Sequence, residues 1–382
     1  MQSQPASTVS ESSIASQTET TSKIELLNMT QEDLKGFFAS LNEPPFRAKQ
    51  VFKWLYHALE TDFMEMTNLS LKLRTKLTQI ASITDLPLLH EQQSQDGTRK
   101  FLFGLHDGAR IESVLIPDEK RNTLCISSQV GCALACKFCY TATMGPGRNL
   151  TVAEYMGQFL GVSRRLPEDQ RITNVVFMGM GEPLVNLKNL FSTLDLLTDD
   201  SGLNIGKRRI TISTAGLCPQ LLELSEKVPV RLAISLHATT DEQRDELMPI
   251  NKRYNIKKLF ETLRHCSTKK RLPVTLEYTL IDQVNDSDAD ARRLAKLAHS
   301  IHAKVNLIPY NEHPGAPDYK RPSAARIERF RDNLQKAHVR ATKRATRGDD
   351  ISAACGQLAI LAEESEVPTS AFKAPSRRKT KR

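Results

Sequence analysis

The stretch Cys132-Ala-Leu-Ala-Cys136-Lys-Phe-Cys139, between Gly131 and Tyr140, decides what the rest of the chain can be. Its cysteines stand four and three positions apart, in a chain with 7 cysteines in 382 residues. Thiolates are soft ligands that suit zinc and iron–sulfur clusters, and structural zinc and ferredoxin-type clusters take four protein ligands. No fourth cysteine lies nearby at ligand spacing, so a four-iron cluster held here would keep one iron open for chemistry. The alternative is three small buried apolar residues without a metal.

Length and composition fit a globular protein with one large domain and a smaller one. Lys and Arg exceed Asp and Glu by 53 − 44 = 9, which favours a polyanionic partner such as RNA or DNA without establishing one. An odd number of cysteines argues against a secreted disulfide framework. Thiolates that hold a cluster must stay reduced, so we expect a cytoplasmic protein.

Both ends of the sequence have a composition typical of flexible chain. Residues 1–23 are rich in Ser, Thr and Gln and predict a disordered extension rather than a signal or transit peptide. Residues 363–382 end in Arg377-Arg-Lys-Thr-Lys-Arg382 and predict a basic flexible tail that adds non-specific RNA affinity. The sequence has no run of 18 apolar residues, so we expect no membrane span.

Residues 24–95 predict a small helical domain. Thr30 and Asp33 resemble a capping box at the start of a first helix, and apolar periodicity predicts two more helices at 46–59 and 69–80. Basic side chains on the second helix suggest an RNA-docking domain. The alternative is a solvated surface on a packing domain.

A β-hairpin follows at residues 96–122, interpreted as a linker between the two domains. Its strands are predicted at 100–105 and 109–116, because Asp107-Gly108 is a strong hairpin-turn signal. Alternation in the second strand predicts that Glu112 faces solvent.

Residues 123–362 alternate between strand and helix patterns. Six strands are predicted, at 124–127, 174–178, 209–213, 230–236, 274–280 and 304–308. Alternating βα units imply a parallel sheet, and six of them suit a partial barrel. The fold class is therefore α/β, a partial (β/α)6 barrel with an N-terminal helical domain and a short β extension. Functional groups are expected at the carboxyl ends of the strands.

Polar residues do follow four of these strands. Gly181 and Glu182 close Gly179-Met-Gly-Glu, which is not a dinucleotide fingerprint because Leu184 stands where the third glycine belongs. Singly, each of these motifs could be strand-end capping. The residues at the other three strand ends are Ser213, Ser235, Leu236, His237 and Asn311. Together, the polar groups at the four strand ends offer directional hydrogen bonds to an amino-acid moiety, a ribose or an adenine.

Cys-x3-Cys-x2-Cys is the signature of the radical S-adenosylmethionine (SAM) enzymes, and Cys125-Ile-Ser-Ser-Gln-Val-Gly-Cys132 resembles one branch, the RlmN/Cfr family of RNA adenine methyltransferases. The resemblance covers residues 24–362. It implies a radical-SAM barrel with one [4Fe-4S] cluster and SAM as cofactors. The implied cluster ligands are Cys132, Cys136 and Cys139, and the implied SAM contacts are Gly181, Glu182, Ser213, Ser235, Leu236, His237 and Asn311.

The same resemblance gives roles to two further cysteines and one carboxylate. Cys355, in Ala-Ala-Cys355-Gly-Gln-Leu, matches the cysteine that one SAM methylates. A radical from a second SAM then takes hydrogen from that methyl group, and the carbon adds to adenine. Cys125 matches the cysteine that releases the product by forming a disulfide with Cys355, and Glu112 matches the proton acceptor. Cys218 and Cys266 are interpreted as small buried residues.

The implied substrates are an adenine of 23S rRNA near the peptidyl-transferase centre and the adenine beside the tRNA anticodon, methylated at carbon-2. A flavodoxin-like electron donor and a monomeric state are also expected. The leading alternative is the Cfr-type reaction at carbon-8 of the same rRNA base. More distant alternatives are a non-catalytic iron–sulfur RNA-binding protein and a radical SAM enzyme that activates another protein through a glycyl radical.

Overall fold

The structure is a computed structural model, which describes residues 23–270 and 274–359. The predicted basic tail and all but one residue of the predicted N-terminal extension lie outside the described residues. Within the described ranges, no helix is long and apolar enough to cross a membrane.

One ten-stranded sheet organises the large domain, in the order β12-β11-β10-β9-β8-β7-β6-β5-β4-β3. All neighbours from β6 to β12 are parallel, whereas β3 to β6 are antiparallel. The six predicted parallel strands are present, and β12 adds a short seventh. The partial-barrel fold is confirmed. The strands are β3 (Leu88–Gln93), β4 (Arg99–Gly104), β5 (Arg110–Asp118), β6 (Arg121–Cys125), β7 (Asn174–Phe177), β8 (Ile210–Thr214), β9 (Arg231–Ser235), β10 (Thr275–Leu280), β11 (Lys304–Pro309) and β12 (Ala341–Lys343).

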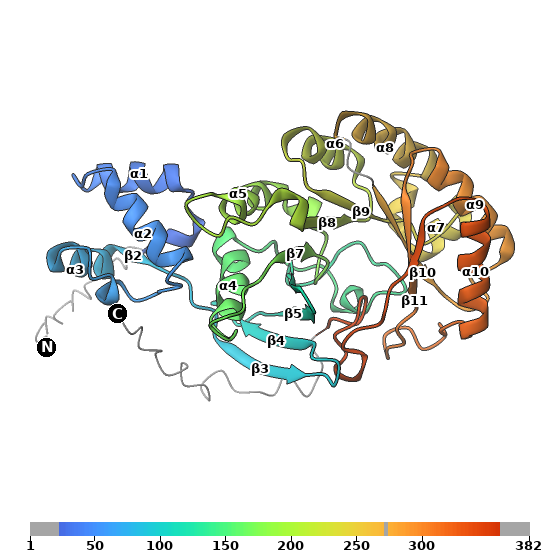
Figure 1. Ribbon diagram of the computed structural model, residues 1–382, viewed down its shortest axis with the longest axis horizontal. Helices are drawn as coiled ribbons and strands as arrows, with labels where there is room; N and C mark the ends of the chain where they lie inside the picture. The colour runs from blue at the N-terminus through green and yellow to red at the C-terminus, as the bar shows by residue number, and fades with distance from the viewer. Residues whose placement is uncertain (1–22, 271–273, 360–382) are drawn as a thin grey trace, which may run out of the picture.

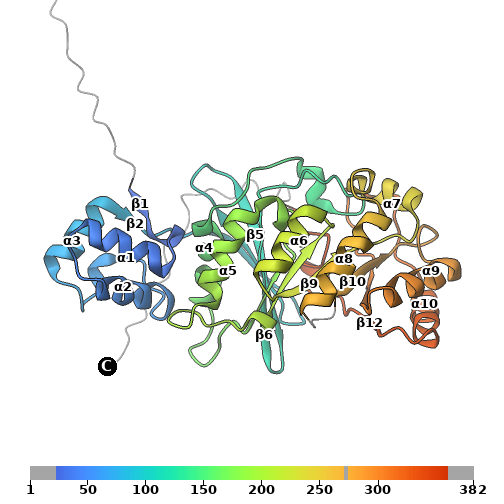
Figure 2. The same ribbon diagram turned by 90° about the horizontal axis from the view of Figure 1, so that it is seen from above.

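Helices cover the outside of the parallel strands (Figure 2). The first begins at a capping box, in which the Glu154 N–H donates to Thr151 Oγ1 (3.1 Å) and the Thr151 N–H donates to Glu154 Oε2 (2.8 Å). Apolar side chains from the strands and these helices form one large core. The helices are α4 (Val152–Ser163), α5 (Leu187–Thr198), α6 (Cys218–Lys227), α7 (Asp241–Leu247), α8 (Ile256–Lys270), α9 (Asp288–His299) and α10 (Ala324–Lys336).

The N-terminal helices form a separate unit at one side of the barrel (Figure 1). The capping box predicted at Thr30 and Asp33 is present, and the helices are α1 (Gln31–Ser40), α2 (Phe46–Tyr56) and α3 (Leu71–Ile80). The unit contacts the barrel through α4, where the Ala153 N–H donates to Asn28 Oδ1 (2.8 Å). A two-stranded parallel pair, β1 (Ile24–Glu25) and β2 (Ala81–Ser82), joins its two ends.

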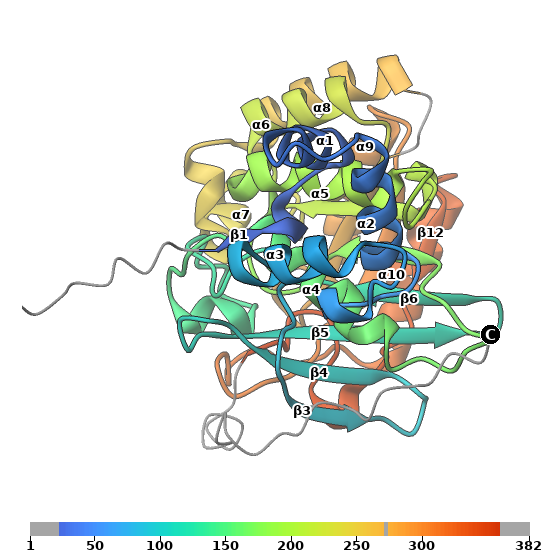
Figure 3. The ribbon, with the colours of Figure 1, turned by 90° about the vertical axis from the view of Figure 1, so that its left-hand side faces the viewer.

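The antiparallel strands β3 to β5 continue the barrel sheet beyond β6 (Figure 3). The predicted hairpin is present as β4 and β5, and a strand that the sequence did not predict, β3, pairs with β4. Both faces of β5 are covered: Ser113 Oγ donates to Gln158 Oε1 of α4 (2.8 Å), and Glu112 faces the barrel interior with no exposed surface. The prediction that Glu112 faces solvent is therefore wrong.

Candidate active site

The three clustered cysteines lie in the loop between β6 and α4, which folds back on itself. The Cys132 N–H donates to the Gly145 carbonyl (2.9 Å), and the Cys139 N–H donates to the Cys136 carbonyl (3.1 Å). A Cβ at Gly131 would stand 2.5 Å from the Gly145 oxygen, so this approach requires glycine. The short helix η3 (Tyr140–Met144) then leads the chain away.

These thiols fit an iron–sulfur cluster better than a single metal ion. Among the described residues, no three His, Cys, Asp or Glu side chains converge closely enough to hold one ion, as structural zinc requires. A four-iron cluster instead spreads its thiolate ligands over its own width. Burial is the main cause that raises the pKa of Cys132 to about 11 and raises the pKa of Cys136 and Cys139 as well. Coordination to iron would stabilise the thiolate forms that burial disfavours.

The Gly-Met-Gly-Glu segment after β7 packs closely against the chain that leaves β6. Gly181 has φ +94°, and a Cβ there would lie 2.5 Å from the Gln129 Cβ. The Glu182 carboxylate is buried and accepts hydrogen bonds from the Ala215 N–H (2.8 Å) and the Leu184 N–H (3.1 Å). Burial raises the pKa of Glu182, while these bonds favour its ionised form. These two bonds fix the carboxylate at the strand ends.

Ser213, Ser235, Leu236 and His237 stand at the neighbouring strand ends of β8 and β9, as predicted. The Thr279 N–H donates to His237 Nδ1 (2.9 Å), so the proton of a neutral ring is on Nε2. Burial, with a smaller effect from Arg244, lowers the pKa of His237 to about 3. His237 is therefore a neutral donor whose ring direction is fixed, and it contacts the Phe138 ring edge at 4.6 Å between centroids.

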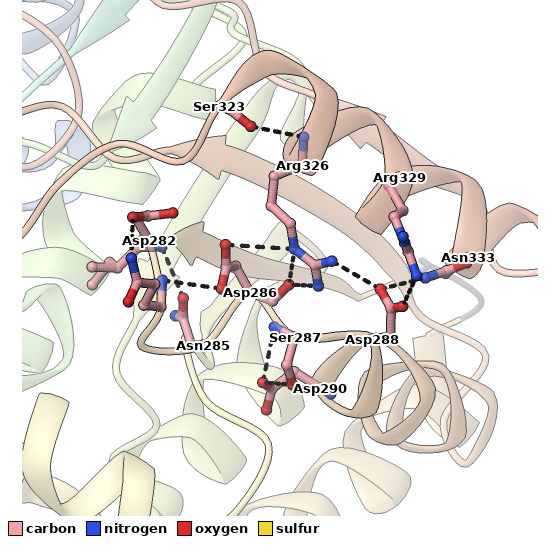
Figure 4. A network of polar contacts seen from close by, with 12 residues as sticks. Asp282, Asn285, Asp286, Ser287, Asp288, Asp290, Ser323, Arg326, Arg329 and Asn333 are labelled. Atoms are coloured by element: carbon pink, nitrogen blue, oxygen red, sulfur yellow. Dashed lines mark hydrogen bonds and ion pairs between the residues drawn. The ribbon is translucent and has the colours of Figure 1, made fainter.

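The loop after β10 fixes the backbone of His237. Asn285 is fully buried and donates from Nδ2 to the carbonyls of His237 (2.8 Å) and Thr279 (2.7 Å). Figure 4 shows how the loop is anchored to α10, where Arg326 binds the Asp286 carbonyl and the Asp288 carboxylate. Sequence analysis did not identify Asn285. The capping residue Ser287 at the start of α9 was the signal for an ordered loop here.

Cys355 lies in the loop after β12, and hydrogen bonds attach this loop to the cysteine-rich loop. Asn311 Nδ2 donates to the Cys355 carbonyl (3.0 Å), and the Tyr140 N–H donates to the Gly356 carbonyl (2.7 Å). Thr141 Oγ1 also donates to the Leu358 carbonyl (2.5 Å). Cys355 is half-buried and lines a cavity of about 180 Å³. Asn311 therefore contacts the Cys355 loop directly, in addition to its predicted role at the SAM pocket.

Cys125 and Glu112 lie on adjacent strands and share the inner face of the sheet. Cys125 pairs with Val114, and Glu112 is two residues before Val114 on the same strand. Burial raises the pKa of Cys125 to about 12, to which a negative charge on Cys355 adds, while Arg344 lowers it. Cys125 and Cys355 are free thiols near enough to interact electrostatically.

Three cationic side chains around these groups, of which Lys100 and Arg244 are buried, were not predicted from the sequence. Lys100 of β4 forms an ion pair with Glu112 (Nζ to Oε1, 3.0 Å), and both side chains are almost fully buried. Arg344 lines the Cys355 cavity and a second cavity of about 280 Å³ inside the barrel, where Glu277 also lies. Arg244 lies beneath the ends of β8 and β9. A single basic residue carries no sequence signal of its own, because its partners come from other elements of the fold.

Comparisons with known proteins agree with this arrangement. Residues 126–295 match the radical SAM superfamily, and residues 24–83 match the ribosomal RNA large subunit methyltransferase N-terminal domain. A crystal structure of a radical SAM methyltransferase from Sphaerobacter thermophilus has a TM-score of 0.84 and 44% sequence identity, and the match covers 87% of this chain and 98% of that one. The class of protein is thus a radical SAM methyltransferase, which uses a [4Fe-4S] cluster and SAM.

The curated relatives specify the family. A protein of Geotalea uraniireducens named dual-specificity RNA methyltransferase RlmN is 48% identical, over 88% of this chain and 96% of its own length. One of Desulfosudis oleivorans with the same name is 50% identical, over 88% of this chain and 90% of its own length. This chain belongs to the RlmN family.

Proposed function

We propose that this enzyme methylates carbon-2 of an adenine in 23S rRNA and of the adenine next to the anticodon in tRNA. The relatives named dual-specificity RNA methyltransferase support both kinds of substrate. The observation that carries the proposal is the attachment of the Cys355 loop to the cysteine-rich loop, with Cys125 facing the same interior. Two free thiols beside the loop proposed to bind the cluster suit a methyl transfer that passes through the protein.

The chemistry of adenine explains why a thiol is needed as an intermediate carrier. Carbon-2 is electrophilic and has no lone pair with which to displace a methyl group from SAM. We propose that Cys132, Cys136 and Cys139 hold the cluster. SAM would bind at the strand ends, and its contacts would be Gly181, Glu182, Ser213, Ser235, Leu236, His237 and Asn311. When bound, the cluster and SAM supply the electron and the radical chemistry.

Three side chains of the protein carry out the remaining steps of the methyl transfer. Cys355, half-buried in its cavity, carries the methyl group as a thioether and becomes the point of attachment to the base. Glu112, in contact with Lys100, accepts the proton that leaves carbon-2. Cys125 attacks the Cys355 sulfur, so that the S–S bond forms as the bond from the Cys355 sulfur to the methylene carbon breaks. That carbon leaves with the bonding electron pair and takes up the proton lost from Cys125, which gives the methylated base and a disulfide that a cellular reductant must open.

The remaining partners follow from this chemistry. The target base must be unstacked to reach a site inside the barrel, so a loop or bulge of RNA is the expected form. The N-terminal helical unit, residues 24–95 in our division, would dock that RNA. We also propose a flavodoxin-like electron donor, a monomer, and a cytoplasmic location, since the thiols must be kept reduced.

Mass spectrometry of nucleosides tests the proposal. 23S rRNA and tRNA that lack the modification are incubated with the cluster-loaded enzyme, SAM and a reductant, and the digested nucleosides are identified. We expect 2-methyladenosine in both RNAs. Formation of 8-methyladenosine would instead support the Cfr-type reaction, and failure to modify tRNA would contradict dual specificity.

A further inference from the structure

Arg244 of α7 is a fully buried arginine whose hydrogen bonds go to uncharged acceptors. Its Nε donates to the Leu236 carbonyl (3.2 Å), and its Nη2 donates to the carbonyls of Ala215 (2.8 Å) and Ser235 (3.2 Å). Its Nη1 donates to the Tyr254 carbonyl (3.2 Å) and to Asn251 Oδ1 (2.9 Å). One guanidinium therefore joins the ends of two strands to the segment after α7.

The strand ends need such a donor because their carbonyls leave the sheet ladder inside the protein. The chain turns sharply after each strand, at Gly216 (φ +97°) and at His237 (φ +54°). A buried carbonyl without a donor costs free energy comparable to a lost hydrogen bond. A guanidinium carries five N–H donors in one plane, so a single side chain serves all of these acceptors.

The same carbonyls belong to the predicted SAM pocket. Ser235 and Leu236 are proposed SAM contacts, and the Ala215 N–H donates to the carboxylate of Glu182, which is another. We infer that Arg244 is a positioning residue for SAM: it fixes the ends of β8 and β9 in the shape that the SAM contacts require. The inference rests on the proposed assignment of those contacts, not on the identity of the RNA base.

The surroundings of Arg244 allow its charge to stay buried. Asn251, which accepts from Arg244, donates from Nδ2 to the carboxylates of Asp245 (2.7 Å) and Asp241 (3.1 Å). Burial lowers the pKa of Arg244 to about 10, so the guanidinium remains charged at neutral pH. A lysine could keep the charge but lacks the planar set of donors.

Direct measurement of SAM binding tests this role. Wild type, Arg244→Met and Arg244→Lys are loaded with cluster and dialysed against labelled SAM without a reductant, so that SAM stays intact. We expect SAM affinity to fall at least about tenfold in Arg244→Met and at least about fivefold in Arg244→Lys. RNA affinity, measured by filter binding, should stay within about twofold, because the guanidinium is buried.

Arg164→Met is the matched control, since Arg164 binds the Leu59 carbonyl and Asp85 away from the strand ends. It should leave SAM affinity within about twofold of wild type. Wild-type SAM affinity in Arg244→Lys would overturn the inference, as would an equal loss in Arg164→Met. If Arg244→Met does not fold, the lysine variant decides. Absence of RNA methylation by the wild type would refute the proposed function but would not alter this result.

Discussion

The site has a strand-borne half and a loop-borne half, which are held in different ways. Cys125 and Glu112 lie in strands of the sheet, where ladder hydrogen bonds and packing on both faces fix them. Cys355 and the cluster cysteines lie in loops that a few hydrogen bonds hold together, among them Tyr140 N–H to Gly356. We infer that Cys355, on its loop, is the thiol that moves between its reaction partners, whereas Cys125 and Glu112 keep fixed positions in the sheet.

Removal of the loop-borne thiol should have the largest effect. Cys355→Ala removes the methyl carrier but none of the proposed cluster ligands, so we expect normal iron content and no detectable methyladenosine. Nucleoside mass spectrometry and iron analysis measure both. Cys266→Ala, which changes a buried cysteine of α8, should retain activity. Methylation by Cys355→Ala would show that the loop does not carry the methyl group.

The two thiols should also differ in reactivity. Burial raises the pKa of Cys125 to about 12, whereas Cys355 is half-buried beside a cavity. At pH 8 iodoacetamide should therefore modify Cys355 at least about a hundredfold faster, because only thiolates react and Cys125 is almost wholly a thiol. Peptide mass spectrometry gives the rates, and buried Cys218 provides a slow reference. Equal rates would remove the distinction between the two halves.

In the segment after β7, which packs against the chain leaving β6, Gly181→Ala should cost stability. The new Cβ would lie 2.5 Å from the Gln129 Cβ at a left-handed φ, so we expect a loss of about 2–4 kcal/mol in the free energy of unfolding. Gly206→Ala is the control, since its φ is −56° and nothing lies within 4 Å of its Cβ. Denaturant titration compares the two. A loss as large in Gly206→Ala would contradict the stated cause.

The smallest expected effect concerns His237 and pH. The pKa of His237 is about 3 in the folded protein, below the ordinary 6.5, so the unfolded chain binds a proton that the folded chain does not. Stability should therefore fall by about 1 kcal/mol from pH 6.5 to 5.5 through this group, and less in His237→Gln. Unfolding titrations at the two pH values measure the difference. Exposed His106→Gln should behave like wild type, and an unchanged slope in His237→Gln would contradict the assigned burial.

Sequence predicted the parts of the site that depend on local pattern. The Cys132–Cys139 spacing and the polar residues after four of the strands followed from motifs and from strand periodicity. The burial of Glu112 could not be predicted in this way, because the alternation rule assumes that one face of a strand is exposed to solvent. Strand β5 is covered by α4 on one face and faces the barrel interior on the other. Lys100 and Arg244 were missed because their partners come from other elements.

The proposal that the methyl group passes through Cys355 and is released by Cys125 is tested most directly with Cys125→Ala. The variant is incubated with RNA, SAM and a reductant, and its nuclease and protease digests are analysed by mass spectrometry. We predict a stable adduct in which one carbon joins the Cys355 sulfur to an adenine. Free methyladenosine at the wild-type rate, with no adduct on Cys355, would contradict the account.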